Sequence, residues 1–302
     1  MHATIVVTFF GISRTVVAMC GAGILVFLVA LWAAKSDIAR ASGLDEIVAL
    51  SNLCFAVPLA VFGALHVSEV GFVLPIVPKY MPWRLFWAYL VGFALLSAAL
   101  SIATKIQVRW SGLLFGIMMF SFVAMLIIPG VFARPGSRFS WIFVFRESSF
   151  GGGGWILAGN ALRERGRGWA KNLIRVGRVL IGMAAVFYGV ENSLHPLNVP
   201  GVPLEMVMPA WLPGRFLIGY VTGAILLIAG MSILLGKKVR MAATYLGTWI
   251  VLLVLFVYGP ILIASLMNPD TGVKIEGINY FADTLLFGGA ILALASATAG
   301  AD

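Results

Sequence analysis

The amino-acid sequence predicts an all-α membrane protein of about nine transmembrane helices, arranged as two parallel four-helix-bundle repeats plus an extra N-terminal helix. Hydrophobic residues make up 61% of the chain and charged residues 11%, whereas soluble domains carry about 25% charge. The mean hydropathy is +1.01, the apolar residues fall in long runs, and one part of the chain resembles a later part at a constant spacing. These observations predict the membrane class, the number of helices and the duplication.

Nine apolar runs are candidates for membrane spans, because crossing a hydrocarbon core of about 30 Å takes roughly 20 helical residues. They cover 15–34, 48–74, 85–104, 110–131, 147–161, 174–194, 216–235, 241–264 and 278–297. The fifth run is the shortest and contains four consecutive glycines from Gly151 to Gly154. Small residues let helix backbones approach closely, so we expect this helix to pack against other helices and not against lipid.

The basic residues predict the orientation of the chain in the membrane. With nine spans, one side receives Lys35, Arg40, Lys105, Arg109, Arg163, Arg165, Arg167, Lys171, Arg175, Arg178, Lys237, Lys238 and Arg240. Basic loops remain in the cytoplasm, so we expect a prokaryotic inner (cytoplasmic) membrane protein with its N-terminus outside and its C-terminus cytoplasmic. The net charge of +9 is explained by this bias, and we expect no nucleic-acid partner.

Cysteine and histidine usage argues against a metal centre. Cys20 and Cys54 are isolated in apolar runs and the sequence has no CxxC motif, so neither a dithiol relay nor a thiolate metal site is expected. The three histidines are His2, His66 and His195. They are too few and too far apart to favour haem or another metal site, and we expect neither.

An internal repeat links the middle of the chain to its last third. A shift of 131 positions aligns 78–129 with 209–260 without a gap, and about fifteen of the fifty-two positions are identical. The matches include Pro78 with Pro209, Pro82 with Pro213, Arg84 with Arg215, Tyr89 with Tyr220, Gly92 with Gly223, and Pro129 with Pro260. Self-similarity of this length indicates duplication. Repeats with an even number of spans run parallel in the membrane.

The repeat divides the chain into four parts. Residues 1–46 form an N-terminal transmembrane helix and cytoplasmic loop, and 47–162 form the first four-helix module. Residues 163–177 are a basic cytoplasmic linker, and 178–302 form the second module. In this alignment Glu147, which we expect to cap the fifth helix, is the counterpart of Asp283.

Before its second helix, each module has an outer loop that contains prolines and ends in an arginine. Arg84 and Arg215 can reach lipid headgroups or anchor their own loops. In the third helix of each module, Pro129 and Pro260 are expected to kink the helix and free a carbonyl group.

The motifs of both copies resemble the DoxX-like family of membrane proteins. The first copy carries Phe62-Gly63-Ala64-Leu65-His66, then Val77-Pro78-Lys79-Tyr80-Met81-Pro82-Trp83-Arg84, Tyr89-x-x-Gly92 and Arg109; the second carries Phe187-Tyr188-Gly189-Val190-Glu191, then Pro209-Ala210-Trp211-Leu212-Pro213-Gly214-Arg215 and Tyr220-x-x-Gly223. The resemblance covers roughly 50–160 and 178–297. It implies four-helix modules that are often found beside oxidoreductases, whereas two fused modules depart from the usual single-module chain.

Ionisable residues within spans are expensive and mark candidate sites. His66 and Glu69 share a helix face at the outer end of the second span, and Glu191 and His195 do so at the end of the sixth. The simpler interpretation is that these side chains only form hydrogen bonds at the helix ends. The alternative is a quinone or lipid headgroup site, in which these side chains act with others that can orient a carbonyl group and exchange protons: Tyr89, Tyr188, Asn192, Tyr220 and Asp283.

The sequence therefore predicts an integral membrane anchor or accessory subunit of a quinone-linked redox assembly, with a quinone or lipid pocket near the outer face. The partners expected are membrane lipid, a redox subunit and, in an oligomer, further copies of the chain. The alternative is a self-contained lipid- or sterol-type binding protein or isomerase-like enzyme, with Glu191 and Asp283 as its acid–base pair. A transporter is the third hypothesis.

Overall fold

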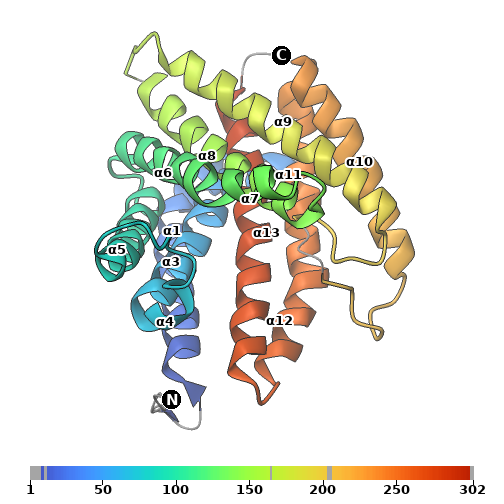
Figure 1. Cartoon of the computed structure of the whole chain (residues 1–302). Coiled ribbons are helices and arrows are strands. Elements are labelled where there is room, and N and C mark those ends of the chain that lie inside the picture. Colours follow the sequence, from blue (N-terminus) through green and yellow to red (C-terminus); the bar gives the residue numbers. More distant parts are fainter. Residues whose placement is uncertain (1–7, 10–11, 164, 203–205, 300–302) are drawn as a thin grey trace.

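The computed structural model describes residues 8–9, 12–163, 165–202 and 206–299. The described chain is almost entirely helical, and α13 runs through its middle (Figure 1). The two strands, β1 (Thr8–Phe9) and β2 (Ile12–Ser13), form one short antiparallel ladder ahead of the first helix.

The helices follow one another with short connections. They are α1 (Arg14–Arg40), α2 (Leu44–Ala49), α3 (Ser51–Ser68), α4 (Val70–Val73), α5 (Arg84–Ala103), α6 (Val108–Phe122), α7 (Ile128–Ala133), α8 (Arg138–Arg163), α9 (Ala170–Leu194), α10 (Arg215–Leu235), α11 (Val239–Leu253), α12 (Gly259–Leu266) and α13 (Thr271–Ala297). Two π-helical turns, η1 (Val123–Ile127) and η2 (Val254–Tyr258), join α6 to α7 and α11 to α12.

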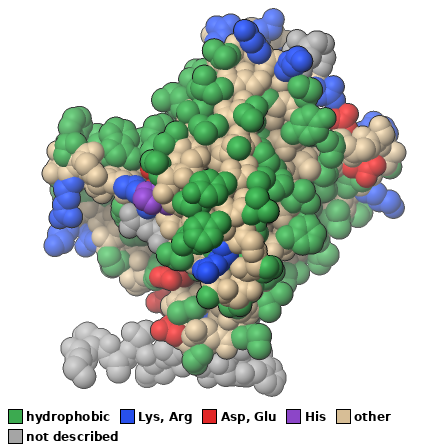
Figure 2. Space-filling view, turned by 90° about the vertical axis from the view of Figure 1, so that its right-hand side faces the viewer, with side chains coloured by type: hydrophobic (Ala, Val, Ile, Leu, Met, Phe, Trp, Pro, Cys, Tyr) green, Lys and Arg blue, Asp and Glu red, His purple; other side chains and the backbone are tan. Residues whose placement is uncertain are grey.

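Eight helical segments of the described chain are long and apolar enough to cross a membrane. The remaining long helix, α8, has 26 residues but carries charges in its first half. Large hydrophobic side chains are exposed over much of the surface, and Figure 2 shows them spread across one face with basic side chains gathered at its upper end. The prediction of an all-α membrane protein with about nine helices is confirmed.

The fifth helix begins earlier than predicted. We expected a span of 147–161, but α8 starts at Arg138, so Arg146 lies inside the helix and not in an outer loop. Glu147 likewise lies more than two turns into α8, and its expected role as a helix cap is wrong. A hydropathy profile ends an apolar run at such charges because it does not show the partner that neutralises them.

Backbone features recur at the spacing of 131 residues. Helices α5 and α10 start at Arg84 and Arg215, and the π-helical turns η1 and η2 keep the same offset. Each π-helical turn precedes a proline, Pro129 or Pro260, whose ring would clash with a carbonyl of a continuous α-helix. The expected distortion at these prolines is therefore a widened turn.

The two repeats interlock through their first and last helices. Helix α3 packs along α5 of its own repeat and along α13 of the other, while α9 packs along α10 and α8 in the corresponding way. Helices α8 and α13 meet in the centre, where a Cβ added to Gly153 would lie 2.5 Å from Cβ of Ala290. Such close approach of backbones explains the glycine run.

The additional helix α1 lies mainly against the first repeat and also touches α13 of the second. It packs mainly on α3, where a Cβ on Gly23 would lie 3.0 Å from Cγ2 of Val61. The second span, which we expected to be one helix over 48–74, is divided into α2, α3 and α4 by non-helical backbone at Leu50 and Glu69.

The connection between α9 and α10 enters the bundle. Its two arms approach each other through the bridge between Asn198 and Val207, and Val199 and Val202 are buried. Gly201 has a φ of 113°, which favours glycine. It lies close to Thr284, halfway along α13: a Cβ added to Gly201 would be 3.2 Å from Cγ2 of Thr284. Irregular backbone at this depth is tolerated because protein surrounds it. We call residues 195–202 and 206–214 the outer plug, after the side of the membrane on which the sequence predicts this connection to lie.

Candidate functional site: a buried polar centre

Charged and polar side chains from three helices meet inside the bundle. We call this group the polar centre. It consists of Arg138, Arg146 and Glu147 of α8, Tyr188, Glu191 and Asn192 of α9, and Asp283 of α13.

Arg146 holds the centre together. Its Nη1 donates to Oδ2 of Asp283 at 2.8 Å, and its Nη2 donates to Oε1 of Glu147 at 2.8 Å. Its guanidinium carbon lies 4.3 Å from the ring centroid of Phe143, a cation–π distance. A buried charge is tolerated only when it is paired and hydrogen-bonded, and Arg146 meets both conditions.

A second ion pair lies nearer the end of the bundle where α8 begins and α9 ends. Arg138 contacts Glu191 through Nε. Between the two pairs, the hydroxyl of Tyr188 donates to the carbonyl of Ile142 at 2.8 Å, and Asn192 donates to the carbonyl of Tyr188 at 2.7 Å. Glu191 and Asn192 follow Tyr188 by three and four positions and so lie on the same side of the helix as Tyr188.

Exposure falls along the centre from the helix ends inward. The Arg138 side chain is 23% exposed, that of Glu191 11% and that of Asp283 10%. Beyond Asp283, Ser149, Phe287 and Ala290 are fully buried. The polar centre is therefore approached from one end of the bundle and ends in dry packing near the middle.

Among the residues that the structure describes, the formal charges of the polar centre do not balance when every group is ionised. Three carboxylates, from Glu147, Glu191 and Asp283, face two guanidinium groups, from Arg138 and Arg146. A proton taken up by one carboxylate makes the group neutral, which favours it in a low-dielectric interior. The arrangement is suited to holding and releasing a proton.

Aromatic side chains flank the outer part of the polar centre. The rings of Phe145 and Phe187 stack with their centroids 4.3 Å apart, and the ring centroids of Trp141 and Phe145 are 6.3 Å apart. The side chain of Trp141 is 38% exposed. A partly exposed cluster of aromatic rings thus lies on the same helices as the Arg138–Glu191 pair.

The structure brings together some of the predicted site residues and separates others. Tyr188, Glu191, Asn192 and Asp283 all belong to the polar centre. His66 does not: its Nδ1 lies 2.8 Å from the carbonyl oxygen of Phe62 on its own helix. The remaining predicted ligand residues lie elsewhere.

Those remaining residues are found at helix ends or on the surface. Glu69 accepts a hydrogen bond from Thr15 of α1 at 3.1 Å. His195 is exposed, Tyr220 is 52% exposed and Tyr89 is partly buried.

Arg84 and Arg215 contact their own loops in matching ways. Arg84 donates to the carbonyls of Val77 at 2.9 Å and Leu74 at 2.5 Å. Arg215 donates to the carbonyl of Met208 at 3.2 Å. Val77 and Met208 each precede their arginine by seven residues, so the repeats share this contact.

Sequence reasoning missed Arg138 and Arg146 as members of a site. The available signal was helical spacing, because Arg138, Ile142, Arg146 and Ser149 recur every three or four residues and so share one helix face. That spacing is visible only if the helix is allowed to begin before Glu147.

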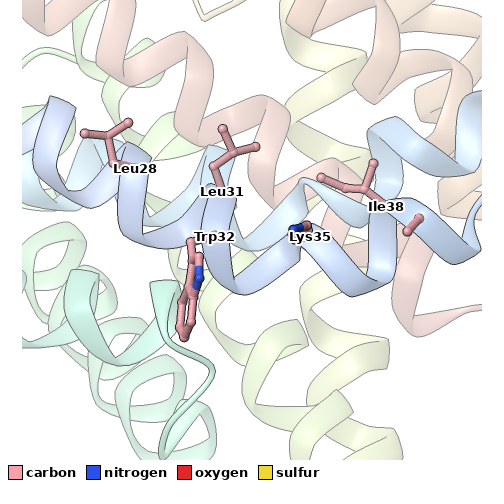
Figure 3. A pocket seen from close by; sticks show the side chains of 6 residues that line it. Leu28, Leu31, Trp32, Lys35 and Ile38 are labelled. Carbon is pink, nitrogen blue, oxygen red and sulfur yellow. The ribbon is translucent and has the colours of Figure 1, made fainter.

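Two surface hollows lie away from the polar centre and share no residue with it. One, of about 400 Å³, lies on the outward face of α1, where Leu28 and Leu31 point to one side and Trp32 to the other (Figure 3). The other, of about 450 Å³, lies at the opposite end of the bundle from the outer plug. Among the described residues, no group of three His, Cys, Asp or Glu side chains is placed to hold a metal ion.

Comparisons with known proteins give no family assignment: no family model, no curated protein and no solved structure matches this chain.

Proposed function

We propose that this protein is an integral membrane subunit of a quinone-linked redox assembly, and that its polar centre exchanges protons with a quinone headgroup at the outer end of α8 and α9. The observation that carries the proposal is the cluster of buried, ion-paired side chains from Arg138 to Asp283, approached from one end of the bundle. The DoxX-like motifs favour the same conclusion, since the resemblance implies modules found beside oxidoreductases.

The residues around the Arg138–Glu191 pair suit a quinone headgroup. Its ring can stack on the surface formed by Trp141, Phe145 and Phe187. A guanidinium group can donate to a quinone carbonyl, and a carboxylate can accept the proton of a quinol hydroxyl.

The chemistry balances with a partner subunit. Oxidation of a quinol to a quinone releases two electrons and two protons. The protons pass to Glu191 and from there to the outer solution, with the deeper carboxylates of Glu147 and Asp283 as a reserve. The electrons pass to a redox cofactor of the partner, because we assign none to this chain.

The finer aspects of localisation belong to the same proposal. We place the chain in a prokaryotic inner membrane with the outer plug facing outward and the basic linker between α8 and α9 in the cytoplasm. The concentration of Lys and Arg at the linker end supports this orientation.

The experiment is isolation of the affinity-tagged chain from its native membranes in a mild detergent. Bound quinone is extracted and quantified, and co-purifying subunits are examined for redox cofactors. We expect quinone with the wild type and roughly tenfold less with Glu191→Gln, since a hydrogen bond to a charged group contributes about 1.5–3 kcal/mol. Glu276→Gln, an exposed acid of α13, is the matched control and should retain quinone.

A chain that elutes alone, without quinone or a redox subunit, contradicts the proposal. If the extract instead contains a sterol-like or other lipid whose retention depends on Glu191 and Asp283, the self-contained lipid-binding alternative replaces it.

A further inference from the structure

A polar cleft lies at the end of the bundle opposite the outer plug. Its volume is about 450 Å³. It is formed where α1, α5, α8 and α13 end and where α2, α3 and α11 begin. Its charged lining residues are Asp37, Arg40, Asp45, Lys105 and Arg240. We call it the linker-end cleft.

The ion pairs of this cleft do not neutralise all of its basic side chains. Asp37 is shared by Arg40, at 2.6 Å, and Lys105. Asp45 pairs with Arg240 at 3.0 Å. Three cations therefore face two carboxylates, so the charged lining residues that the structure describes carry a net charge of +1.

The cations keep donors outside these pairs. Arg240 reaches both oxygens of Asp45 through Nη2, which leaves the donors of Nε and Nη1 outside that contact. Lys105 contacts Asp37 through one ammonium group that carries three donors. Phosphate oxygens are strong acceptors for such groups, and arginine binds them through two donors at once.

The position of the cleft indicates the source of the phosphate. It lies at the level of the helix ends, where lipid headgroups lie, and its walls include Val48, Ala49 and Ala295. Basic pockets between helices on this side of membrane proteins are suited to anionic headgroups. A headgroup phosphate can enter while its glycerol and acyl carbons contact the apolar wall.

We propose that the linker-end cleft binds the phosphate of an anionic phospholipid headgroup through Lys105, Arg240 and Arg40. The bound anion neutralises the excess charge and ties the ends of α1, α5 and α11 together. The site is separate from the polar centre and does not depend on the quinone proposal.

The test measures lipid retention by the purified full-length chain. The chain is placed in nanodiscs of phosphatidylcholine with one fifth phosphatidylglycerol, released into detergent, and analysed by native mass spectrometry. We expect preferential retention of phosphatidylglycerol by the wild type. The double variant Lys105→Gln/Arg240→Gln should retain about tenfold less, because two basic residues at the membrane surface have been removed.

A matched control removes equal charge outside the cleft at the same end of the bundle. Lys171→Gln/Arg175→Gln changes two exposed residues of α9 and should retain the lipid as the wild type does. Equal retention by both double variants, or equal loss in both, overturns the proposal, because the effect then comes from general surface charge.

An arm with inorganic phosphate distinguishes the two sources of the group. Millimolar phosphate that raises the unfolding temperature of the wild type, but not of the cleft variant, while phosphatidylglycerol shows no preference, supports the phosphate site and assigns it to a soluble anion. No response to either ligand contradicts the proposal. Each variant's unfolding temperature without ligand shows whether it has folded.

Discussion

Arg146 and Asp283 occupy equivalent positions in the two repeats and form an ion pair with each other, at 2.8 Å. The equivalence follows from packing. A Cβ on Gly151 would meet Met119 and Phe120, and a Cβ on Gly288 would meet Ile250 and Val251, their counterparts at the repeat spacing. Arg146 lies five residues before Gly151, and Asp283 lies five residues before Gly288. The duplication thus placed opposite charges at matched points of α8 and α13.

The first prediction concerns the order of stability losses in this pair. Arg146→Met leaves Glu147 and Asp283 without their common partner and should cost about 3–5 kcal/mol, the usual penalty for an uncompensated buried charge. Asp283→Asn leaves Arg146 paired with Glu147 and should cost less. Thermal unfolding in detergent measures both. An Asp283→Asn variant that unfolds at a lower temperature than Arg146→Met contradicts this assignment of Arg146 as the hub.

Sequence patterns predicted much of the architecture because they report local and additive properties. Hydropathy located eight of the spans, and the spacing of 131 predicted distortions at matching places, Pro129 and Pro260; the structure has a π-helical turn before each. The start of α8 was wrong, since Arg146 becomes tolerable within a helix only through Asp283, 137 positions away.

The counterpart of Asp283 was also displaced by one position. Aligning acid with acid favoured Glu147, whereas the contacts of Gly151 and Gly288 place Arg146 there. Likewise, no local signal shows that α3 packs on α13 of the other repeat, because that choice depends on how the two repeats meet in space.

The second prediction tests the close approach at the centre. In Gly153→Ala the new Cβ would lie 2.5 Å from Cβ of Ala290 and 2.9 Å from Cε2 of Phe55. Overpacking of this kind costs about 1–3 kcal/mol, so the unfolding temperature should fall.

Gly21→Ala is the control for helix propensity. A Cβ at Gly21 of α1 would have no heavy atom within 4 Å, and alanine favours a helix by about 1 kcal/mol over glycine. Its unfolding temperature should stay the same or rise. Similar behaviour of the two variants would show that α8 and α13 are not in contact at Gly153.

The third prediction concerns the arginine contacts shared by the repeats. Arg84→Gln should loosen the loop from Leu74 to Trp83, because the guanidinium group bonds to the carbonyls of Leu74 and Val77. Arg215→Gln should loosen the segment around Met208 in the same way. Hydrogen exchange of these segments should rise by about tenfold, since such bonds to charged groups contribute about 1.5–3 kcal/mol. Exposed Arg134, changed to Gln, should leave both rates unaltered.

The fourth prediction concerns the outer plug, which reaches the middle of α13 beside Asp283. The hydroxyl of Tyr258, in the π-helical turn η2, donates to the carbonyl of Pro200 at 2.6 Å. Tyr258→Phe leaves that buried carbonyl without this donor, at a cost of about 1–3 kcal/mol. The plug should then open more often, and the amide hydrogens of Val199 and Met208, which bond to the carbonyls of Met206 and Leu197, should exchange faster.

Tyr245→Phe separates this contact from a general effect of losing a hydroxyl. Tyr245 lies on α11, the helix that leads into η2, and is 58% exposed, so its exchange profile should match the wild type. Faster exchange confined to residues 195–214 in Tyr258→Phe identifies the widened turn before Pro260 as the support of the plug. Unchanged exchange would mean that buried Val199 and Val202 hold the plug without it.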